Sequence, residues 1–119
     1  MRYPISGSNT VTLDGTANLT GQALLGRNLS TGRVFWLRQV RVWNASAGNI
    51  LALFDASVGT TYAATAALAR IEAATGGVTR VSFDAPGLRF YTNCLIARNA
   101  TTVSGAFAAG SVGGSGYEE

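Results

Sequence analysis

One stretch, residues 33–46, constrains the fold more than any other part of the chain; it reads Arg-Val-Phe-Trp-Leu-Arg-Gln-Val-Arg-Val-Trp-Asn-Ala-Ser. It is rich in β-branched and aromatic residues and contains neither Gly nor Pro, which favours an extended strand. A turn-forming segment follows at 44–49, and the apolar run 50–54 begins directly after it. The pattern predicts a β-hairpin in which these two apolar segments are neighbouring strands.

The alternation of side chains along this strand changes phase near Arg38. A two-residue repeat places Val40 and Val42 on one face together with Arg38, whereas between residues 33 and 38 both faces are apolar. Two interpretations fit this pattern: a β-bulge near Arg38, or a segment that is covered on both sides.

The bulky residues of the strand also leave two interpretations open. In the first, a sandwich core covers one face and a loop of the same chain covers the other. In the second, one of Phe35, Trp36 and Trp43 faces a neighbouring subunit, because aromatic residues and Arg are enriched where proteins meet.

Length and composition favour one small domain, 1–119, with a thin core. A chain of 119 residues is long enough to fold without disulfides, but much of its 47% apolar fraction is Ala, and 15 residues are Gly. Association with other chains would add buried surface that such a core lacks. The composition, together with the large apolar residues on both faces of 35–43, therefore favours a homo-oligomer.

The basic residues are nine Arg with no Lys, against six acids, for a net charge of +3. They are scattered along the chain, whereas nucleic-acid-binding proteins usually carry a basic cluster or stripe, so no direct nucleic-acid partner is expected. Each guanidinium is a planar fork suited to carboxylate pairing and aromatic stacking. No run approaches the roughly 18 apolar residues of a membrane span, so no membrane partner is expected.

Shorter apolar or alternating runs predict further strands, at 10–13, 22–25, 68–73, 78–83, 88–90, 94–98 and 101–108. The Ala-rich stretch 60–75 also fits one face of a helix, but a hairpin of 68–73 with 78–83 is favoured. Residues 1–8 read as an extended arm and 110–119 as a flexible Gly-rich tail. The predicted fold is all-β: a single antiparallel β-sandwich of about seven or eight strands, of jelly-roll type.

The chain lacks the residues that catalysis usually needs. It has no His, and its acids do not form pairs at a motif spacing, so neither an enzyme nor a cofactor or metal site is expected. Asp55 and Asp84 flank turns, where carboxylates ordinarily accept hydrogen bonds from backbone N–H groups. The single cysteine, Cys94, lies in an apolar run and is expected to be a small buried hydrophobe.

Four segments carry a family resemblance: 37–46, 50–55, 83–90 and the closing Gly-Tyr-Glu at 116–118. Together they resemble small β-sandwich virion proteins of tailed bacteriophages, including auxiliary head proteins that decorate or cement capsids. The resemblance covers residues 33–119. It implies a non-enzymatic structural protein that multimerises, often as a trimer, and binds the major capsid protein or another virion protein. Such a protein would be made in the host cytoplasm and located on the capsid surface.

An alternative is a tail-associated or carbohydrate-binding module in which Trp36, Trp43 or Tyr62 stacks on sugar rings. In either case the candidate interface residues of the central strand are Phe35, Trp36, Arg38, Arg41 and Trp43. The chain ends add Tyr3, Tyr117, Glu118 and Glu119, either as frayed termini or as segments that dock on a neighbouring subunit.

Overall fold

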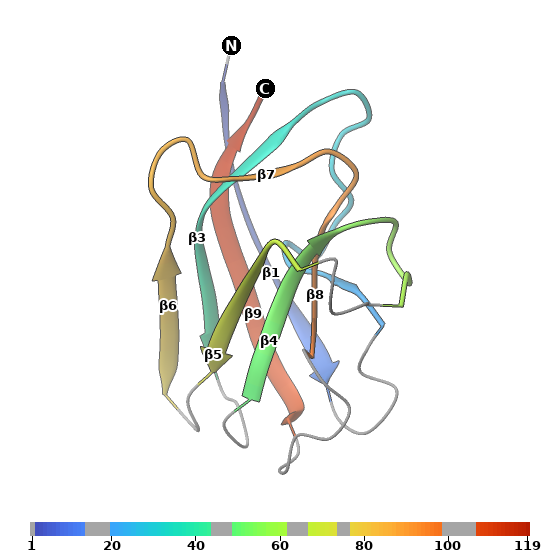
Figure 1. Ribbon diagram of the computed structural model, residues 1–119, viewed down its shortest axis with the longest axis vertical. Coiled ribbons are helices and arrows are strands. Elements are labelled where there is room, and N and C mark those ends of the chain that lie inside the picture. Colours follow the sequence, from blue (N-terminus) through green and yellow to red (C-terminus); the bar gives the residue numbers. More distant parts are fainter. Residues whose placement is uncertain (1, 14–19, 44–48, 62–66, 74–76, 99–106) are drawn as a thin grey trace.

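The protein consists of two antiparallel β-sheets packed against each other, as the computed structural model shows (Figure 1). The structure describes residues 2–13, 20–43, 49–61, 67–73, 77–98 and 107–119. Within these ranges it has nine strands and no helix, which confirms the all-β prediction, with more strands than the seven or eight expected.

The first sheet has five strands. Four of them lie in the order β1 (Tyr3–Leu13), β9 (Phe107–Glu118), β3 (Phe35–Trp43) and β6 (Val78–Ser82). The short β7 (Leu88–Phe90) pairs with the beginning of β3, on the edge that β6 occupies further along. β3 is therefore paired on both edges over most of its length.

The second sheet has four strands in the order β2 (Gln22–Ala23), β8 (Cys94–Arg98), β4 (Asn49–Asp55) and β5 (Ala69–Ala73). The outward side of this sheet is covered by the chain itself: Phe54 and Leu95 form a small apolar cluster that Ala56 and Ala67 cover. Backbone hydrogen bonds between Gly21 and the 59–60 turn hold the covering loop in place. Residues 51–54 of β4 are thus buried on both faces, which explains their unbroken apolar sequence.

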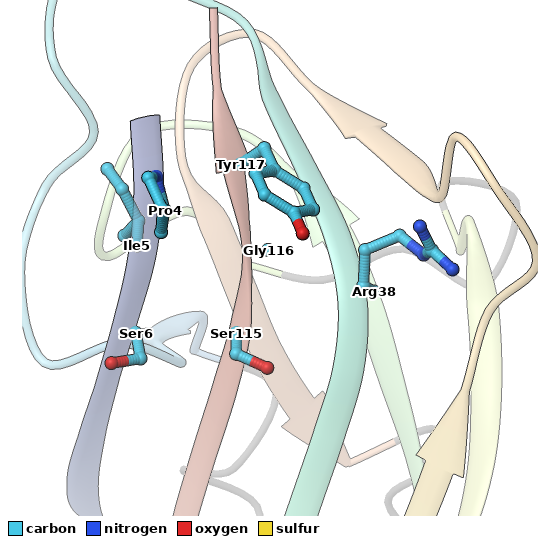
Figure 2. A pocket seen from close by; sticks show the side chains of 7 residues that line it. All are labelled: Pro4, Ile5, Ser6, Arg38, Ser115, Gly116 and Tyr117. Atoms are coloured by element: carbon cyan, nitrogen blue, oxygen red, sulfur yellow. The ribbon is translucent and has the colours of Figure 1, made fainter. Parts of the chain in front are cut away.

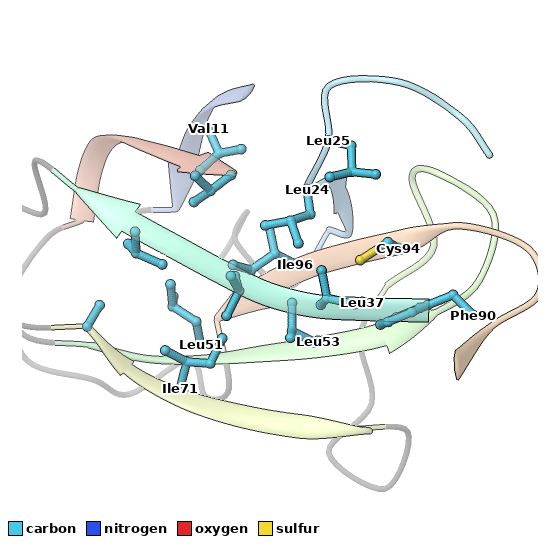
Figure 3. Close-up of a cluster of buried hydrophobic side chains, with 14 of the residues drawn as sticks. Val11, Leu24, Leu25, Leu37, Leu51, Leu53, Ile71, Phe90, Cys94 and Ile96 are labelled. Carbon is cyan, nitrogen blue, oxygen red and sulfur yellow. The ribbon is translucent and has the colours of Figure 1, made fainter. Parts of the chain in front are cut away.

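The main core lies between the two sheets and uses alternate residues of each strand (Figure 3). β3 contributes Phe35, Leu37, Val40 and Val42, all of them buried, and the facing sheet contributes residues such as Leu51, Leu53, Ile71 and Ile96. Burying each large apolar side chain contributes about 1.5–3 kcal/mol, so this shared core holds the two sheets together.

A β-bulge at Arg38 accounts for the change of phase in β3. Leu37 pairs with Gly116 and Gln39 with Ser115, so Arg38 is an extra residue relative to β9. The bulge keeps both halves of the strand in phase with the core, which confirms the first of the two interpretations. The expectation that Arg38 shares a face with Val40 and Val42 was wrong, because its side chain lies on the opposite, outward side (Figure 2).

Both predicted hairpins were wrong. β3 and β4 belong to different sheets, as do β5 and β6, and neither pair is hydrogen bonded. The turn residues mark correctly where each strand ends. However, β3 pairs with β6, β7 and β9, which are distant in the sequence, and β4 pairs with β5, the strand after it, and with β8. The chain therefore crosses from one sheet to the other at these points. Of the predicted strand 101–108, residues 101–106 lie outside the described residues and 107–108 begin β9; the candidate Tyr62 also lies outside the described residues.

The predicted arm and tail are instead two long strands. Residues 3–11 pair in unbroken register with residues 110–118, and β9 also pairs with β3. At the end of the sheet, Glu119 and Val34 exchange backbone hydrogen bonds of 2.8 and 3.1 Å. Small polar residues gave these ends little apolar signal, but backbone pairing on both edges orders β9 without it.

Glycine is required in β9 because neighbouring strands approach it closely. A Cβ on Gly116 would collide with the carbonyl oxygen of Trp36, and one on Gly114 would lie 3.0 Å from both Leu24 and Leu37 side chains. We predict that Gly116→Ala lowers the free energy of unfolding by about 2–3 kcal/mol in urea denaturation. Ser115→Ala, on the same strand with its side chain facing outward, should change it by less than about 0.5 kcal/mol. Equal stabilities of the two variants would contradict this packing.

Candidate interaction surface

The outward side of the five-stranded sheet, called the outer face below, is the part of the described molecule that combines aromatic and Arg side chains. The register of the strands places these side chains in cross-strand rows. Because β1 and β9 contribute small residues, the larger side chains of β3, β6 and β7 stand beside a flat area.

The first row runs from Pro4 through Tyr117 and Trp36 to Arg89, on β1, β9, β3 and β7. The Arg89 guanidinium lies 5.7 Å from the ring centroid of Trp36 and 4.8 Å from that of Tyr91. Such cation–π contacts hold the guanidinium and cover the rings. The indole N–H of Trp36 is buried and has no hydrogen-bond partner among the described residues.

The second row contains two arginines side by side. Arg41 on β3 is directly opposite Arg80 on β6, and Gly113 and Ser8 continue the row on β9 and β1. A Cβ on Gly113 would lie 3.5 Å from a guanidinium nitrogen of Arg41, so the glycine leaves room for that side chain over β9. Within the described part of the chain, Nε of Arg41 is buried without a hydrogen-bond partner.

A third row ends the outer face with Thr10, Ser111, Trp43 and Val78. Val78 is 53% exposed, and Trp43 is half-buried. Apolar surface on an edge strand next to a tryptophan is common where proteins associate.

A shallow depression of about 410 Å³ lies on the outer face between Arg38 and the first strand. Its lining includes Pro4, Ser6, Ser115 and Tyr117, and Figure 2 shows the Tyr117 ring between Pro4 and Arg38. Nε of Arg38 donates a 3.0 Å hydrogen bond to the carbonyl oxygen of Phe83. This bond holds the guanidinium toward the end of β6, so the head group points away from Tyr117 and Ser115 (Figure 2).

The structure brings together five of the nine candidate interface residues: Trp36, Arg38, Arg41, Trp43 and Tyr117 all lie on the outer face. Phe35 does not, because its ring is wholly buried in the core, where it contacts Phe90. The sequence did not show which side of the strand faces the core, because the side chains on both sides are apolar before the bulge.

The other three candidates, Tyr3, Glu118 and Glu119, form contacts at the paired chain ends. Glu118 is 5% exposed and its carboxylate is 3.4 Å from Nε of Arg33, whose guanidinium lies 4.9 Å from the Tyr3 ring centroid. Glu119 accepts a 2.8 Å hydrogen bond from Arg2. These carboxylates are therefore paired within the chain.

Sequence reasoning missed Arg80 and Arg89, which also lie on the outer face. The signal for Arg80 was present, because strict alternation over 78–82 groups it with exposed Val78 and Ser82. Arg89 had no such signal, since β7 is only three residues long.

The remaining polar groups support structure. The carboxylate of Asp55 accepts hydrogen bonds of 2.8–3.0 Å from the backbone N–H groups of Tyr91, Thr92 and Asn93, which confirms the predicted capping role. Among the described residues, no group of His, Cys, Asp and Glu could hold a metal ion. A search of the same residues finds no helix that could cross a membrane.

No protein-family model matches the chain, and no curated protein matches it in a sequence search. Geometry and residue chemistry are therefore what any functional conclusion must rest on.

The environment of Cys94 allows a direct test of the packing around Asp55. Burial raises the pKa of the Cys94 thiol well above its ordinary value, and the nearby charge of Asp55 raises it further. At about pH 8 the thiol stays protonated and shielded, so we predict that a disulfide reagent labels it at least tenfold more slowly in the folded protein than in guanidinium chloride. Rapid labelling of the folded protein would show that Cys94 is accessible.

Proposed function

We propose that this chain is a non-enzymatic structural protein of a bacteriophage virion that decorates or cements the capsid. It docks on the lattice of the major capsid protein through the outer face and stabilises the head. It is made in the host cytoplasm and ends on the capsid surface.

The strand order supports a jelly roll, the finer fold on which this proposal rests. The order β1-β9-β3-β6 faces the order β2-β8-β4-β5, so the first and last strands are neighbours and most consecutive strands alternate between sheets. Two interlocked Greek keys produce this kind of arrangement, which is common in viral capsid and lectin domains.

The observation that carries the proposal is the difference between the two sheets. The outward side of the four-stranded sheet is partly covered by residues of its own chain, including Ala56 and Ala67. The five-stranded sheet instead presents Trp36, Trp43 and Tyr117 with several arginines, on a surface without metal-ligand clusters in the described part of the chain. Aromatic and Arg side chains are enriched at protein interfaces, so this is the surface best suited to a macromolecular partner.

The chain also assembles as a homo-oligomer, most simply a trimer. Exposed apolar side chains lie away from the outer face at Ile50, Val58 and Leu68, on or near the four-stranded sheet. They give copies of the chain a contact surface that leaves the outer face available for the lattice. Sedimentation at tens of micromolar should give the mass of a trimer, and a monomer at that concentration would contradict this part of the proposal.

The second candidate is a tail-associated or carbohydrate-binding module. It is favoured by the depression beside Tyr117, where an exposed aromatic ring and the Ser6 and Ser115 side chains adjoin an arginine. Aromatic rings and hydroxyl groups of this kind also suit a sugar ring.

Particles produced from a phage genome that encodes this chain provide the test. We predict that particles lacking the chain rebind the purified protein, and that Trp43→Ala weakens this binding at least tenfold, as expected for an aromatic residue central to an interface. Arg27→Ala, an exposed substitution near β2 that lies outside both the outer face and the apolar surface assigned to assembly, serves as the control and should bind normally. Failure to bind particles, together with a glycan-array signal that Trp43→Ala abolishes, would favour the carbohydrate-binding alternative.

A further inference from the structure

The arginines of the outer face have no carboxylate partners within the described part of the chain. Arg38, Arg41, Arg80 and Arg89 all lie there, and none of them forms a salt bridge with a described Asp or Glu. Most of the described acids are located away from these arginines: Asp55 caps a turn, Glu72 lies on β5, and Glu118 is paired with Arg33. Asp84 lies in the turn after β6, and Glu119 continues the outward row of Tyr117 at the end of the sheet, where it is paired with Arg2. The outer face therefore carries an excess of positive charge.

The position of two of these arginines favours an anionic partner. Arg41 and Arg80 are direct cross-strand neighbours, an arrangement that destabilises a sheet when both residues carry the same charge. A carboxylate placed over this row would offset the repulsion between the two guanidinium groups.

Arg38 is a further cation of this face that is held in one orientation. The hydrogen bond to the Phe83 carbonyl fixes the Arg38 side chain at Nε, so its terminal nitrogens are oriented before any partner arrives. An oriented guanidinium is a suitable partner for an Asp or Glu side chain. Hydroxyl groups of Ser115 and Tyr117, which line the depression on the other side of β3, can donate hydrogen bonds to the same partner surface.

The positive charge of the outer face and the guanidinium above its aromatic rings argue against two other partners, a second copy of the chain and a nucleic acid. A second copy stacked on this face through its own outer face would place arginines against arginines, which costs free energy instead of gaining it. The Trp36 and Tyr91 rings carry the Arg89 guanidinium above them, so they are not open platforms for stacked nucleic-acid bases.

We propose that the outer face binds a carboxylate-rich protein surface, with one Asp or Glu side chain of the partner paired with the Arg38 guanidinium. This inference rests on the proposed function, in which that partner is the capsid lattice, and it specifies the chemistry that the lattice presents. Binding through such contacts weakens as salt is added, because ions screen partly exposed charge pairs.

The test measures fluorescence anisotropy of labelled poly-L-glutamate and of a labelled oligo-dT of similar length, titrated with the full chain at low salt. Arg38→Gln and Arg80→Gln should each weaken poly-L-glutamate binding by about five- to tenfold. Arg27→Gln removes the same charge from an exposed site near β2, and should weaken binding by less than about twofold. Arg80 is exposed, so its substitution tests the face even if Arg38→Gln disturbs the bulge.

If Arg27→Gln weakens poly-L-glutamate binding as much as the two outer-face variants do, the binding depends only on net charge, and the inference is overturned. Tighter binding of oligo-dT that depends on Arg38 would replace the protein partner by a nucleic acid. Self-association that Arg80→Gln abolishes would replace it by a second copy. If the chain binds particles but does not bind poly-L-glutamate as expected, the carboxylate-rich partner is ruled out and the proposed function stands. If the chain binds poly-L-glutamate as expected but does not bind particles, the proposed function is ruled out and the chemistry assigned to the outer face stands.

Discussion

The pairing of the last strand, β9, between β1 and β3 is the constraint on which the rest of the structure depends. β9 lies against both neighbours closely because its sequence is made of small residues. On the core side, Gly114 lets Leu24 and Leu37 pack against the strand, and on the outward side Gly113 leaves room for the Arg41 guanidinium. One run of Gly and Ser therefore shapes both the core and the surface of the five-stranded sheet.

The bulge at Arg38 adds the second constraint. Without the extra residue, the two halves of β3 could not both direct their apolar side chains into the core. With it, Trp36, Arg41 and Trp43 all lie on the outward side, beside Arg38 itself. The feature that preserves the core thus also concentrates aromatic and cationic side chains on a single surface. On the other sheet, residues of the same chain, Ala56 and Ala67, pack against part of the outward side.

Sequence reasoning located most strands, including β3, β4, β6 and β8, because their side chains carry clear apolar patterns. It failed on pairing: turn chemistry at 44–49 indicates where β3 ends but not which sheet the next strand joins, since pairing depends on distant segments. It also failed on the ends, where Ser, Gly and Thr carry no apolar signal and order comes from backbone hydrogen bonds. For the interaction surface, residue types identified Trp36 and Trp43, whereas excluding Phe35 and adding Arg80 required the register of the sheet.

The central claim is that the outer face of the five-stranded sheet is the surface that contacts the capsid. Electron microscopy of the intact particle, at a resolution that separates the strands, tests it most directly. The account predicts that β1, β9 and β3 face the shell, with Trp43 and Arg38 in the contact and acidic side chains of the shell protein opposite them. A particle in which the outer face points to solvent while the four-stranded sheet contacts the shell would contradict it.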